Sequence, residues 1–302
     1  MILVTGGTGF IGQVLVRQLV SLGYPVRLLL NPSMNSPRIP KGVAVDVAIA
    51  GIQDERNLRA AMKGVRTVFH FIGTEWKGIN ADYLNTDIQS AEMFSKVAAQ
   101  MNVERFFYLS HIGADKSSAY AVLKAKAIAE AAIRTSGVPF TILRSAVVYG
   151  PGDHFTESFA RYIRSVPQMI MLPGKGESRI QPIWVEDLVT CLLLCLDNDK
   201  TIFQTINLGG MEVLTINQCI DLILSAIGKK KRILHIPPPG LRTIIVALEQ
   251  WFENFPRMYF WMDYLAEDRI TALDVLPREF GLMPTRMSQN LSYLENIGNK
   301  YK

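Results

Sequence analysis

The sequence predicts a doubly wound α/β fold, in which helices cover both faces of a parallel sheet. Three observations predict this class. Short, continuously apolar runs alternate with helical stretches through the first 150 residues, a glycine-rich turn joins the first run to the first helix, and the pattern loosens after residue 150. Strands that are apolar on both faces are typical of a sheet buried between two layers of helices.

The first half supplies the strands and helices of this sheet in alternating order. Continuous apolar runs predict strands over residues 2–5, 25–30, 68–71, 106–109 and 140–143. Apolar residues at helical spacing predict helices over residues 11–22, 58–62, 87–101 and 120–136. We therefore expect residues 1–150 to form a first domain.

The second half predicts a smaller α/β lobe over residues 151–302. It contains a strand-like run at 205–208, a helical stretch at 216–227 and a break at the Pro-Pro-Pro-Gly of residues 237–240. After the break, seven apolar residues fall on one helical face: Leu241, Ile244, Ile245, Leu248, Trp251, Phe252 and Phe255. We expect elements around residues 180–210 to rejoin the first domain, and the lobe to pack over the carboxyl edge of the sheet, where such folds bind ligands.

The composition excludes several classes of protein. A chain of 302 residues with 49% hydrophobic side chains can bury a large core, which excludes intrinsic disorder. Its 3 cysteines form no CxxC pair and its 4 histidines show no metal spacing, which argues against a disulfide framework and a metal site. The net charge is +5, and we interpret the one basic run, residues 229–232, as a solvated helix end rather than a phosphate or membrane contact.

The chain also shows no signal for a membrane span or for export. The longest apolar stretch, around residues 192–196, is far shorter than the ~20 residues that cross a bilayer, and Met1 runs directly into a predicted strand. We therefore expect a cytoplasmic protein in a reducing compartment. No part of the sequence resembles a nucleic-acid-binding module.

The glycine-rich turn carries the strongest functional signal. Residues 5–12 read Thr-Gly-Gly-Thr-Gly-Phe-Ile-Gly, directly after a strand and at the start of a helix. Gly6 permits the tight turn, Gly9 lets a pyrophosphate approach the backbone, and Gly12 lets the helix pack closely on the strand. The pyrophosphate then binds the N–H groups at the positive end of the helix. This arrangement predicts a Rossmann-type site for a nicotinamide dinucleotide.

The choice between NAD and NADP depends on the end of the second strand. An acidic residue there would bind the ribose 2′-hydroxyl of NAD, but this chain has Asn31. An uncharged Asn31 does not repel a 2′-phosphate, and Arg27, Arg38 and Lys41 lie nearby in the sequence. We therefore prefer NADP(H) slightly over NAD(H).

Further motifs follow in a fixed order along nearly the whole chain. They are Asp54 with Leu58, His70-Phe71-Ile72-Gly73, Ser110, Tyr120-x-x-x-Lys124, Leu143-Arg144-Ser145, Val148-Tyr149-Gly150-Pro151-Gly152 and Pro182-Ile183-Trp184-Val185-Glu186-Asp187. With the glycine turn, they resemble the short-chain dehydrogenase/reductase superfamily, in the extended and atypical branch that includes NAD-dependent epimerase/dehydratase-like proteins. The tail, residues 280–294, resembles the subgroup that contains the nucleotide-binding accessory subunit of respiratory complex I and its bacterial homologues.

Tyr120 and Lys124 are the predicted catalytic pair. A spacing of four residues puts both side chains on one face of the predicted helix, and the Lys124 ammonium then lowers the pKa of the Tyr120 phenol toward the range of a general acid or base. The resemblance implies that this lysine also binds the nicotinamide ribose, and that a Ser or Thr polarises the substrate carbonyl while hydride passes to or from the nicotinamide. It further implies cofactor contacts at Thr8, Phe10, Ile11, Asn31, Ile52, Ile72, Gly73 and Tyr149.

The sequence departs from the family pattern at two places. Ile112 occupies the usual place of the catalytic Ser or Thr after the fifth strand, and an isoleucine donates no hydrogen bond. Ser110 is our candidate for that role, with His111, Ser117 and Ser118 as alternatives. At the second place Gly51 stands where relatives have an Asp that binds adenine, which predicts weaker nucleotide binding.

Other chemically suggestive residues have simpler interpretations. We interpret His70 as a core histidine with satisfied hydrogen bonds, Cys191 and Cys195 as packing residues, and Asp187 as a residue that begins or caps a helix. The aromatic and methionine-rich segment 252–262 is interpreted as lobe core, with a hydrophobic pocket or partner interface as the close alternative and a membrane contact as the lesser one.

Two functions from different classes fit these residues. The first is an oxidoreductase or epimerase that acts on a carbonyl or hydroxyl compound, with Tyr120 as acid or base and Lys124 as its activator. The second is a non-catalytic accessory or assembly protein that holds NADP(H) and docks on a larger, respiratory complex through its aromatic C-terminal lobe. A redox-sensing regulator is a third and weaker candidate.

Overall fold

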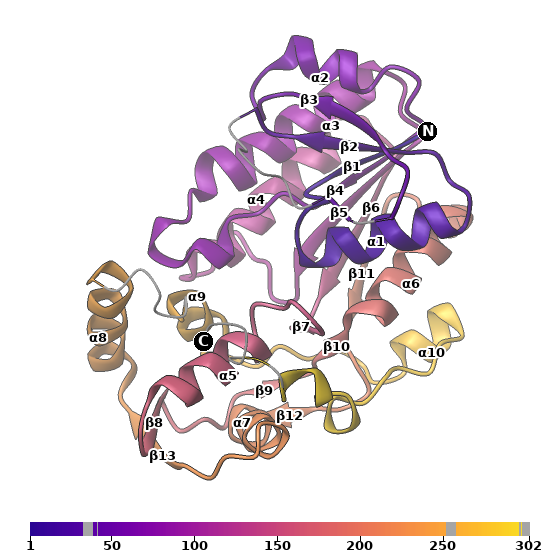
Figure 1. Ribbon diagram of the computed structural model, residues 1–302. Helices are drawn as coiled ribbons and strands as arrows, with labels where there is room; N and C mark the ends of the chain where they lie inside the picture. Colours follow the sequence, from indigo (N-terminus) through magenta and orange to yellow (C-terminus); the bar gives the residue numbers. More distant parts are fainter. Residues whose placement is uncertain (33–38, 41, 252–257, 296, 298–302) are drawn as a thin grey trace. The chain divides into compact units, whose positions relative to one another are not determined.

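The central element of the computed structural model is a seven-stranded sheet (Figure 1). The strand order is β11-β6-β5-β4-β1-β2-β3, and β1 pairs in parallel with both β2 and β4. The strands are β1 (Ile2–Thr5), β2 (Val26–Leu30), β3 (Asp46–Ile49), β4 (Thr67–His70), β5 (Arg105–His111), β6 (Phe140–Ser145) and β11 (Gln204–Leu208). The order in which successive strands are added to the sheet reverses between β1 and β4. This reversal confirms the predicted doubly wound class. The structure describes residues 1–32, 39–40, 42–251, 258–295 and 297.

Helices cover both faces of this sheet. Figure 1 shows α3 and α4 along one face and α1 and α6 along the other. The helices are α1 (Phe10–Ser21), α2 (Glu55–Ala61), α3 (Ser90–Gln100), α4 (Ala121–Thr135) and α6 (Val185–Leu196), together with the π-helical turn η2 (Tyr83–Gln89) and the 3₁₀ turn η3 (Asp199–Thr201). The core between the sheet and α2, α3 and α4 is apolar, and Leu58, Phe94, Phe106 and Ile133 are fully buried in it.

These elements form the first of two compact units. Unit 1 comprises residues 1–74, 82–144 and 189–207, and unit 2 comprises residues 75–81, 145–188 and 208–302. The described residues of unit 2 form three two-stranded sheets, β7 with β10, β9 with β12, and β8 with β13. Its strands are β7 (Val148–Tyr149), β8 (Met169–Pro173), β9 (Arg179–Ile180), β10 (Ile183–Trp184), β12 (Leu214–Thr215) and β13 (Arg232–Ile236). Its helical elements are η1 (Glu75–Asn80), α5 (Thr156–Ser165), α7 (Ile216–Ala226), α8 (Pro238–Trp251), α9 (Tyr259–Tyr264), α10 (Val275–Phe280), η4 (Met287–Gln289) and η5 (Ser292–Leu294).

A buried carboxylate anchors the start of α5 in unit 2. Asp153 is fully buried and accepts hydrogen bonds from the backbone N–H groups of Gly150, Phe155 and Glu157 and from the hydroxyls of Thr156 and Tyr293. Burial raises the pKa of Asp153 to about 6, and the hydrogen bonds from Thr156, Gly150, Glu157 and Tyr293 limit that rise because they favour the charged form.

Several predicted element boundaries need correction. Residues 87–101 are not one α-helix, because the π-helical turn η2 precedes α3. The predicted break at residues 237–240 is shorter than expected, because β13 ends at Ile236 and α8 begins at Pro238, where a proline without an N–H group is tolerated in the first helical turn. The expected apolar face of α8 is only partly buried: Leu241 and Ile245 are buried, whereas Ile244 and Trp251 are exposed. Phe252 and Phe255 lie outside the described residues.

The expectation that Cys191 and Cys195 are packing residues is confirmed. All three cysteines are free and buried, so they pack in the core. None of the helices in the described ranges is both long enough and apolar enough to cross a membrane. The described side chains also form no cluster of His, Cys, Asp and Glu that could hold a metal ion.

Arg105 ties the last part of unit 1 to the sheet. Its buried guanidinium donates to the Thr141 hydroxyl at 3.0 Å, to the carbonyl oxygens of Cys195 and Asn198 at 2.9 Å each, and to the Thr201 hydroxyl. Because this group satisfies carbonyls at the end of α6, it fixes the chain that leads into β11.

We expect Arg105→Met to lower the free energy of unfolding by about 2–4 kcal/mol, because it removes a charged donor from these buried acceptors, of which the two carbonyl oxygens keep only neutral donors such as the Thr201 hydroxyl. Urea unfolding followed by circular dichroism measures the change. The matched control is Arg66→Met, whose exposed guanidinium pairs with Glu104 at 2.8 Å, and we expect a loss below about 1 kcal/mol. Equal losses in the two variants would contradict this account of Arg105.

Candidate dinucleotide site

The turn between β1 and α1 is packed too closely for any side chain at two of its glycines. Gly6 has φ +70°, and a Cβ there would lie 2.6 Å from the carbonyl oxygen of Phe71. A Cβ at Gly12 would overlap the carbonyl oxygen of Gly6 and lie 2.7 Å from the Cα of Gly7. The first turn of α1 is therefore held directly against the carboxyl end of β1.

This turn presents the positive end of α1 at the reversal point of the sheet. Gly9 is the N-cap residue, so no side chain caps the helix, and the first turn contains no acidic residue. The Gln13 side chain donates to the carbonyl oxygen of Thr8 at 2.8 Å and fixes the turn. Gly9 is exposed, and Thr8, Phe10 and Ile11 are half-buried. An anion that approaches Gly9 would meet backbone N–H groups and the helix dipole without a competing carboxylate.

The end of β2 differs from one part of the sequence interpretation. Asn31 follows β2 and is exposed. Arg27, in contrast, lies at the start of β2, where its guanidinium pairs with Asp46 at 2.7 Å and donates to the carbonyl oxygen of Ala61 at 2.7 Å. Arg27 is thus at the opposite edge of the sheet and cannot bind a 2′-phosphate beside Asn31. Arg38 and Lys41 lie outside the described residues.

The adenine side of the predicted site has room. A Cβ added at Gly51 would meet only the Asp54 Cβ, at 3.9 Å, so a larger residue fits there. Asp54 caps α2 by accepting from the backbone N–H of Asn57 at 3.0 Å. Ile52, Ile72 and Gly73 are half-buried at the ends of β3 and β4.

His70 is a core residue, as predicted. It is fully buried in β4, and its ring nitrogens contact the hydroxyls of Thr5 at 3.0 Å and Ser90 at 3.3 Å. Burial, aided by the nearby positive charge of Lys126, lowers the pKa of His70 to about 3. The imidazole is therefore neutral at physiological pH and unsuited to be the acid or base.

Tyr120 and Lys124 lie at the start of α4, Tyr120 just before the helix and Lys124 within its first turns. Tyr120 is the N-cap residue of α4 with ψ 119°, and its carbonyl oxygen accepts from the N–H of Lys124 at 3.1 Å. Its N–H donates to the Ser118 hydroxyl at 3.1 Å, which ends the preceding loop. Lys124 is exposed on α4, so water screens its ammonium.

A different lysine of α4 is buried in unit 1. The Lys126 Nζ lies 3.4 Å from the Asp87 Oδ1, and the two side chains are 4% and 0% exposed. Asp87 also accepts from the Thr74 hydroxyl at 2.7 Å, and Lys126 lies 5.4 Å from the centre of the Tyr108 ring. Residue 122, four positions before Lys126, is a buried valine.

The sequence reasoning missed Lys126, although a signal for it exists. Lys126 continues the apolar stripe of α4 that includes Val122, Leu123 and Ala129, whereas Lys124 does not. A lysine inside an apolar stripe is rarely buried without a partner, so its position alone indicates a special role.

The strand-five residues are engaged within the core. Ser110 is fully buried, and its hydroxyl donates to Glu130 Oε1 at 2.6 Å. Glu130 is in turn bound by the Arg144 guanidinium at 2.8 and 2.7 Å. Ile112 is also buried. To act on a substrate as predicted, the Ser110 hydroxyl would therefore have to give up its hydrogen bond to the charged Glu130 carboxylate.

Two further predicted residues belong to unit 2. Tyr149 in β7 is fully buried, its phenol donates to the carbonyl oxygen of Thr285 at 3.4 Å, and burial raises its pKa well above the usual value. Asp187 accepts from the backbone N–H of Thr285 at 2.6 Å and from its hydroxyl at 3.2 Å. Asp187 therefore lies in the first turn of α6, at the start of the helix as predicted, and also holds the segment around residue 285.

A parallel sheet with a tightly packed glycine turn at its reversal point defines an α/β protein of the nucleotide-binding class. Residues 2–209 match the model of the NAD dependent epimerase/dehydratase family. The chain therefore belongs to the NAD dependent epimerase/dehydratase family.

Curated relatives have diverse names. The chain is 29% identical to the mitochondrial NADH dehydrogenase [ubiquinone] 1 alpha subcomplex subunit 9 of Arabidopsis thaliana, over 78% of this chain and 60% of that protein. It is 25% identical to the ceramide reductase of Caulobacter vibrioides, over 86% and 81%. The chain thus spans less than two thirds of the length of several curated relatives that it matches.

Solved structures share the fold across both units. The UDP-glucose 4-epimerase of Thermotoga maritima has a TM-score of 0.73 at 22% identity and covers 99% of this chain and 98% of its own. The UDP-glucose 4-epimerase of Thermus thermophilus, in complex with NAD, has a TM-score of 0.73 at 19% identity and covers 100% and 99%. At these identities the likeness establishes the fold.

We expect Gly12→Ala to weaken binding of a nicotinamide dinucleotide by at least about ten-fold, because the new Cβ forces α1 away from β1. Isothermal titration calorimetry with NADH and NADPH measures the change. Gly51→Ala is the matched control, since its Cβ has space, and should change affinity less than about two-fold. Unchanged affinity in Gly12→Ala would show that the dinucleotide binds elsewhere.

Proposed function

We propose that the chain binds a nicotinamide dinucleotide on the Gly6–Gly12 turn and acts as an oxidoreductase or epimerase on a carbonyl or hydroxyl compound. The observation that carries the proposal is the close packing of Gly6 and Gly12, which exposes the uncapped, positive end of α1 where β1 ends. A turn of this kind suits a pyrophosphate that crosses the strand end. When bound, the dinucleotide supplies or accepts the hydride.

For the cofactor, membership of an NAD-dependent family supports a nicotinamide dinucleotide, and we propose a modest preference for NADP(H). Asn31 supports this preference because it is exposed, uncharged and placed directly after β2. It would tolerate the 2′-phosphate, whereas a carboxylate at the same place would repel it. Arg27 lies at the opposite edge of the sheet, so its positive charge does not attract the 2′-phosphate. The proposed preference for NADP(H) therefore rests only on the lack of repulsion at Asn31.

For the chemistry, we propose that Tyr120 is the proton donor or acceptor and that Lys126 supplies the fixed positive charge of the site. A buried ammonium influences its surroundings more strongly than an exposed one, and Lys126 is 4% exposed whereas Lys124 faces water. Asp87 lies 3.4 Å from the Lys126 ammonium and holds it in place. Lys124 would then be a solvent-exposed residue of α4 with no part in the reaction.

A second candidate function is a non-catalytic accessory or assembly protein that holds the dinucleotide. Three observations favour it: Ile112 replaces a hydrogen-bond donor, Ser110 is bound to Glu130, and Val122 places no phenol four residues before Lys126. Curated relatives named as subunits of NADH dehydrogenase support the same function. In this case we propose that the partner binds through the C-terminal lobe, in a bacterial-type cytoplasmic setting or, as the relatives' names suggest, a mitochondrial one.

Cofactor preference is tested first with the unchanged chain. We expect NADPH to bind with higher affinity than NADH, and Asn31→Asp to reverse the order by weakening NADPH at least about ten-fold through repulsion of the 2′-phosphate. Energy transfer from tryptophan to the reduced nicotinamide measures both affinities. Tighter binding of NADH by the unchanged chain would refute the preference, and no binding of either cofactor up to millimolar concentration would refute the site.

The roles of the two lysines are tested as a matched pair. We expect Lys126→Met to weaken dinucleotide binding at least about ten-fold and Lys124→Met to change it less than about two-fold, because only Lys126 is buried with its charge. Lys126→Met also leaves the buried Asp87 carboxylate without its ion-pair partner. Dinucleotide binding is therefore also measured in the double variant Asp87→Asn/Lys126→Met, which separates loss of a binding contact from misfolding. Equal effects at the two positions would contradict the assignment of Lys126.

Tyr120→Phe distinguishes the enzyme from the accessory protein. We expect it to lower oxidation of NADPH with a panel of aldehydes and ketones about 10²- to 10⁴-fold, with dinucleotide affinity unchanged, because a phenylalanine transfers no proton. Turnover that persists in the variant would remove Tyr120 from the mechanism. Absence of turnover in the unchanged chain, with the dinucleotide bound, would favour the accessory function.

A further inference from the structure

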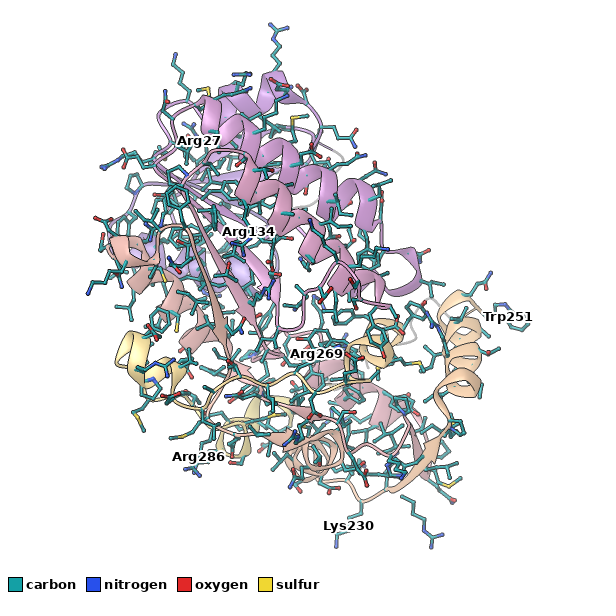
Figure 2. The ribbon with its side chains drawn as sticks, turned by 180° about the vertical axis from the view of Figure 1, so that it is seen from behind. Arg27, Arg134, Lys230, Trp251, Arg269 and Arg286 are labelled. Carbon is teal, nitrogen blue, oxygen red and sulfur yellow. The ribbon has the colours of Figure 1, made fainter. Side chains whose placement is uncertain are left out.

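The carboxyl ends of β1 and β4 are joined by side chains as well as by the sheet. Thr5 and His70 are the last register pair of these two strands, and the Thr5 hydroxyl lies 3.0 Å from Nδ1 of His70. The same hydroxyl oxygen accepts from the backbone N–H of Phe71 at 3.3 Å. This junction lies where the glycine turn begins, whereas Arg27 lies near the start of β2, toward the other end of the sheet (Figure 2).

His70 is enclosed by aromatic rings of the core. Its side chain is fully buried, and its ring centre lies 4.7 Å from that of Phe94 and 5.8 Å from that of Phe106. Its second ring nitrogen, Nε2, lies 3.3 Å from the Ser90 hydroxyl. A neutral imidazole has one N–H donor and one acceptor nitrogen, so His70 donates to one of its two hydroxyl neighbours and accepts from the other.

Ser90 decides which nitrogen of His70 carries the proton. The Ser90 hydroxyl donates to the carbonyl oxygen of Thr86, and a carbonyl oxygen can only accept. Because a hydroxyl has a single proton, Ser90 can only accept from His70. Nε2 therefore carries the imidazole proton, and Nδ1 accepts from the Thr5 hydroxyl. The three bonds form one directed chain from Thr5 through His70 and Ser90 to Thr86 of η2.

This chain acts on the most closely packed part of the glycine turn. A Cβ at Gly6 would lie 2.6 Å from the carbonyl oxygen of Phe71, so the turn and residue 71 are in backbone contact. The Thr5 hydroxyl binds the N–H of the same residue 71. Because the single proton of Thr5 is committed to His70, a lone pair of the hydroxyl is left for that N–H group.

We propose that His70, as the tautomer protonated on Nε2, is a positioning residue for the dinucleotide. It holds the Thr5 hydroxyl, and through it the Gly6 turn, in the geometry that receives the pyrophosphate. The neutral ring suits this role, because a proton on Nδ1 would force the Thr5 hydroxyl to accept there and to turn away from its present orientation. The proposal rests on dinucleotide binding at this turn and adds a residue that does not itself touch the ligand.

The tautomer is tested by nitrogen-15 NMR of histidine-labelled protein at neutral pH, without dinucleotide. Protonated and unprotonated ring nitrogens resonate far apart, and substitution of the histidines at 111, 154 and 235 one at a time identifies the His70 signals. We expect the proton on Nε2, with Nδ1 unprotonated. A proton on Nδ1 of His70 would overturn the directed chain.

The positioning role is tested by the Kd for NADH and NADPH in two variants of Thr5. Thr5→Val keeps the branched shape but removes the hydroxyl, so we expect the Kd of the tighter dinucleotide to rise at least about five-fold. Thr5→Ser retains the hydroxyl and should leave this Kd within about two-fold of the unchanged protein. Equal Kd values in the two variants would overturn the role.

A matched pair of serines on α3 tests the far end of the chain. Ser90→Ala removes the acceptor of the Nε2 proton, so we expect a weaker affinity for the dinucleotide and a shift of the imidazole proton toward Nδ1. Ser95→Ala is the control, because Ser95 is equally buried in α3 and its hydroxyl donates only within its own helix, to the carbonyl oxygen of Glu92 at 3.1 Å. Equal affinities and an unchanged tautomer in both variants would contradict the chain.

The two measurements separate this proposal from the proposed function. Binding that is intact in the unchanged protein, with the wrong tautomer or no effect of Thr5→Val, would refute only the role of His70. Absence of binding of both dinucleotides, with the expected tautomer in the NMR spectrum, would refute the dinucleotide site and with it the positioning role.

Discussion

The rest of unit 1 depends on the contact between the first turn of α1 and the carboxyl end of β1. Side chains are excluded at Gly6 by the Phe71 carbonyl and at Gly12 by the Gly6 carbonyl, so helix and strand meet backbone to backbone. Because β1 lies between β2 and β4, this single contact sets where the helix dipole points relative to both halves of the sheet. The ligand chemistry of the fold follows from that geometry rather than from any one reactive side chain.

The second constraint is electrostatic and acts through α4. Lys126 and Glu130 are four residues apart on this helix, and both are buried. Lys126 is paired with Asp87 of η2, and Glu130 is paired with Arg144 of β6 and bonded to Ser110 of β5. Moving α4 would strand several buried charges at once, which is far costlier than exposing apolar surface. The helix is therefore held in register by charge as well as by packing.

The sheet and the glycine turn could be predicted because their signals are local. Apolar runs identify buried strands, and a glycine triplet between a strand and a helix is a strong indication of a nucleotide-binding turn. The edge strand β3 could not be predicted in this way, since Val47 and Ile49 are exposed and the strand is defined by its pairing with β2. The start of α8 at Pro238 was missed because a proline both ends helices and begins them.

The candidate site was harder to predict because spacing does not determine burial. Tyr120 and Lys124 have the required spacing, but the helix starts one residue after Tyr120, and the exposed side of α4 carries Lys124. The position of Lys126 in the apolar stripe of α4 is visible in the sequence, but its partner Asp87, 39 positions earlier, is identified only by the structure. Likewise, Arg27 is close to Asn31 in sequence but at the other end of the same strand.

The chain order of the sheet has a consequence for synthesis on the ribosome. The strand β11 pairs next to β6, yet it follows β6 by about 60 residues, nearly all of which belong to unit 2 or α6. While those residues are being made, β6 is an open edge of a nascent sheet, and the carbonyls that Arg105 will bind do not yet exist. An emerging chain with an unpaired edge strand is vulnerable to pairing with neighbouring chains.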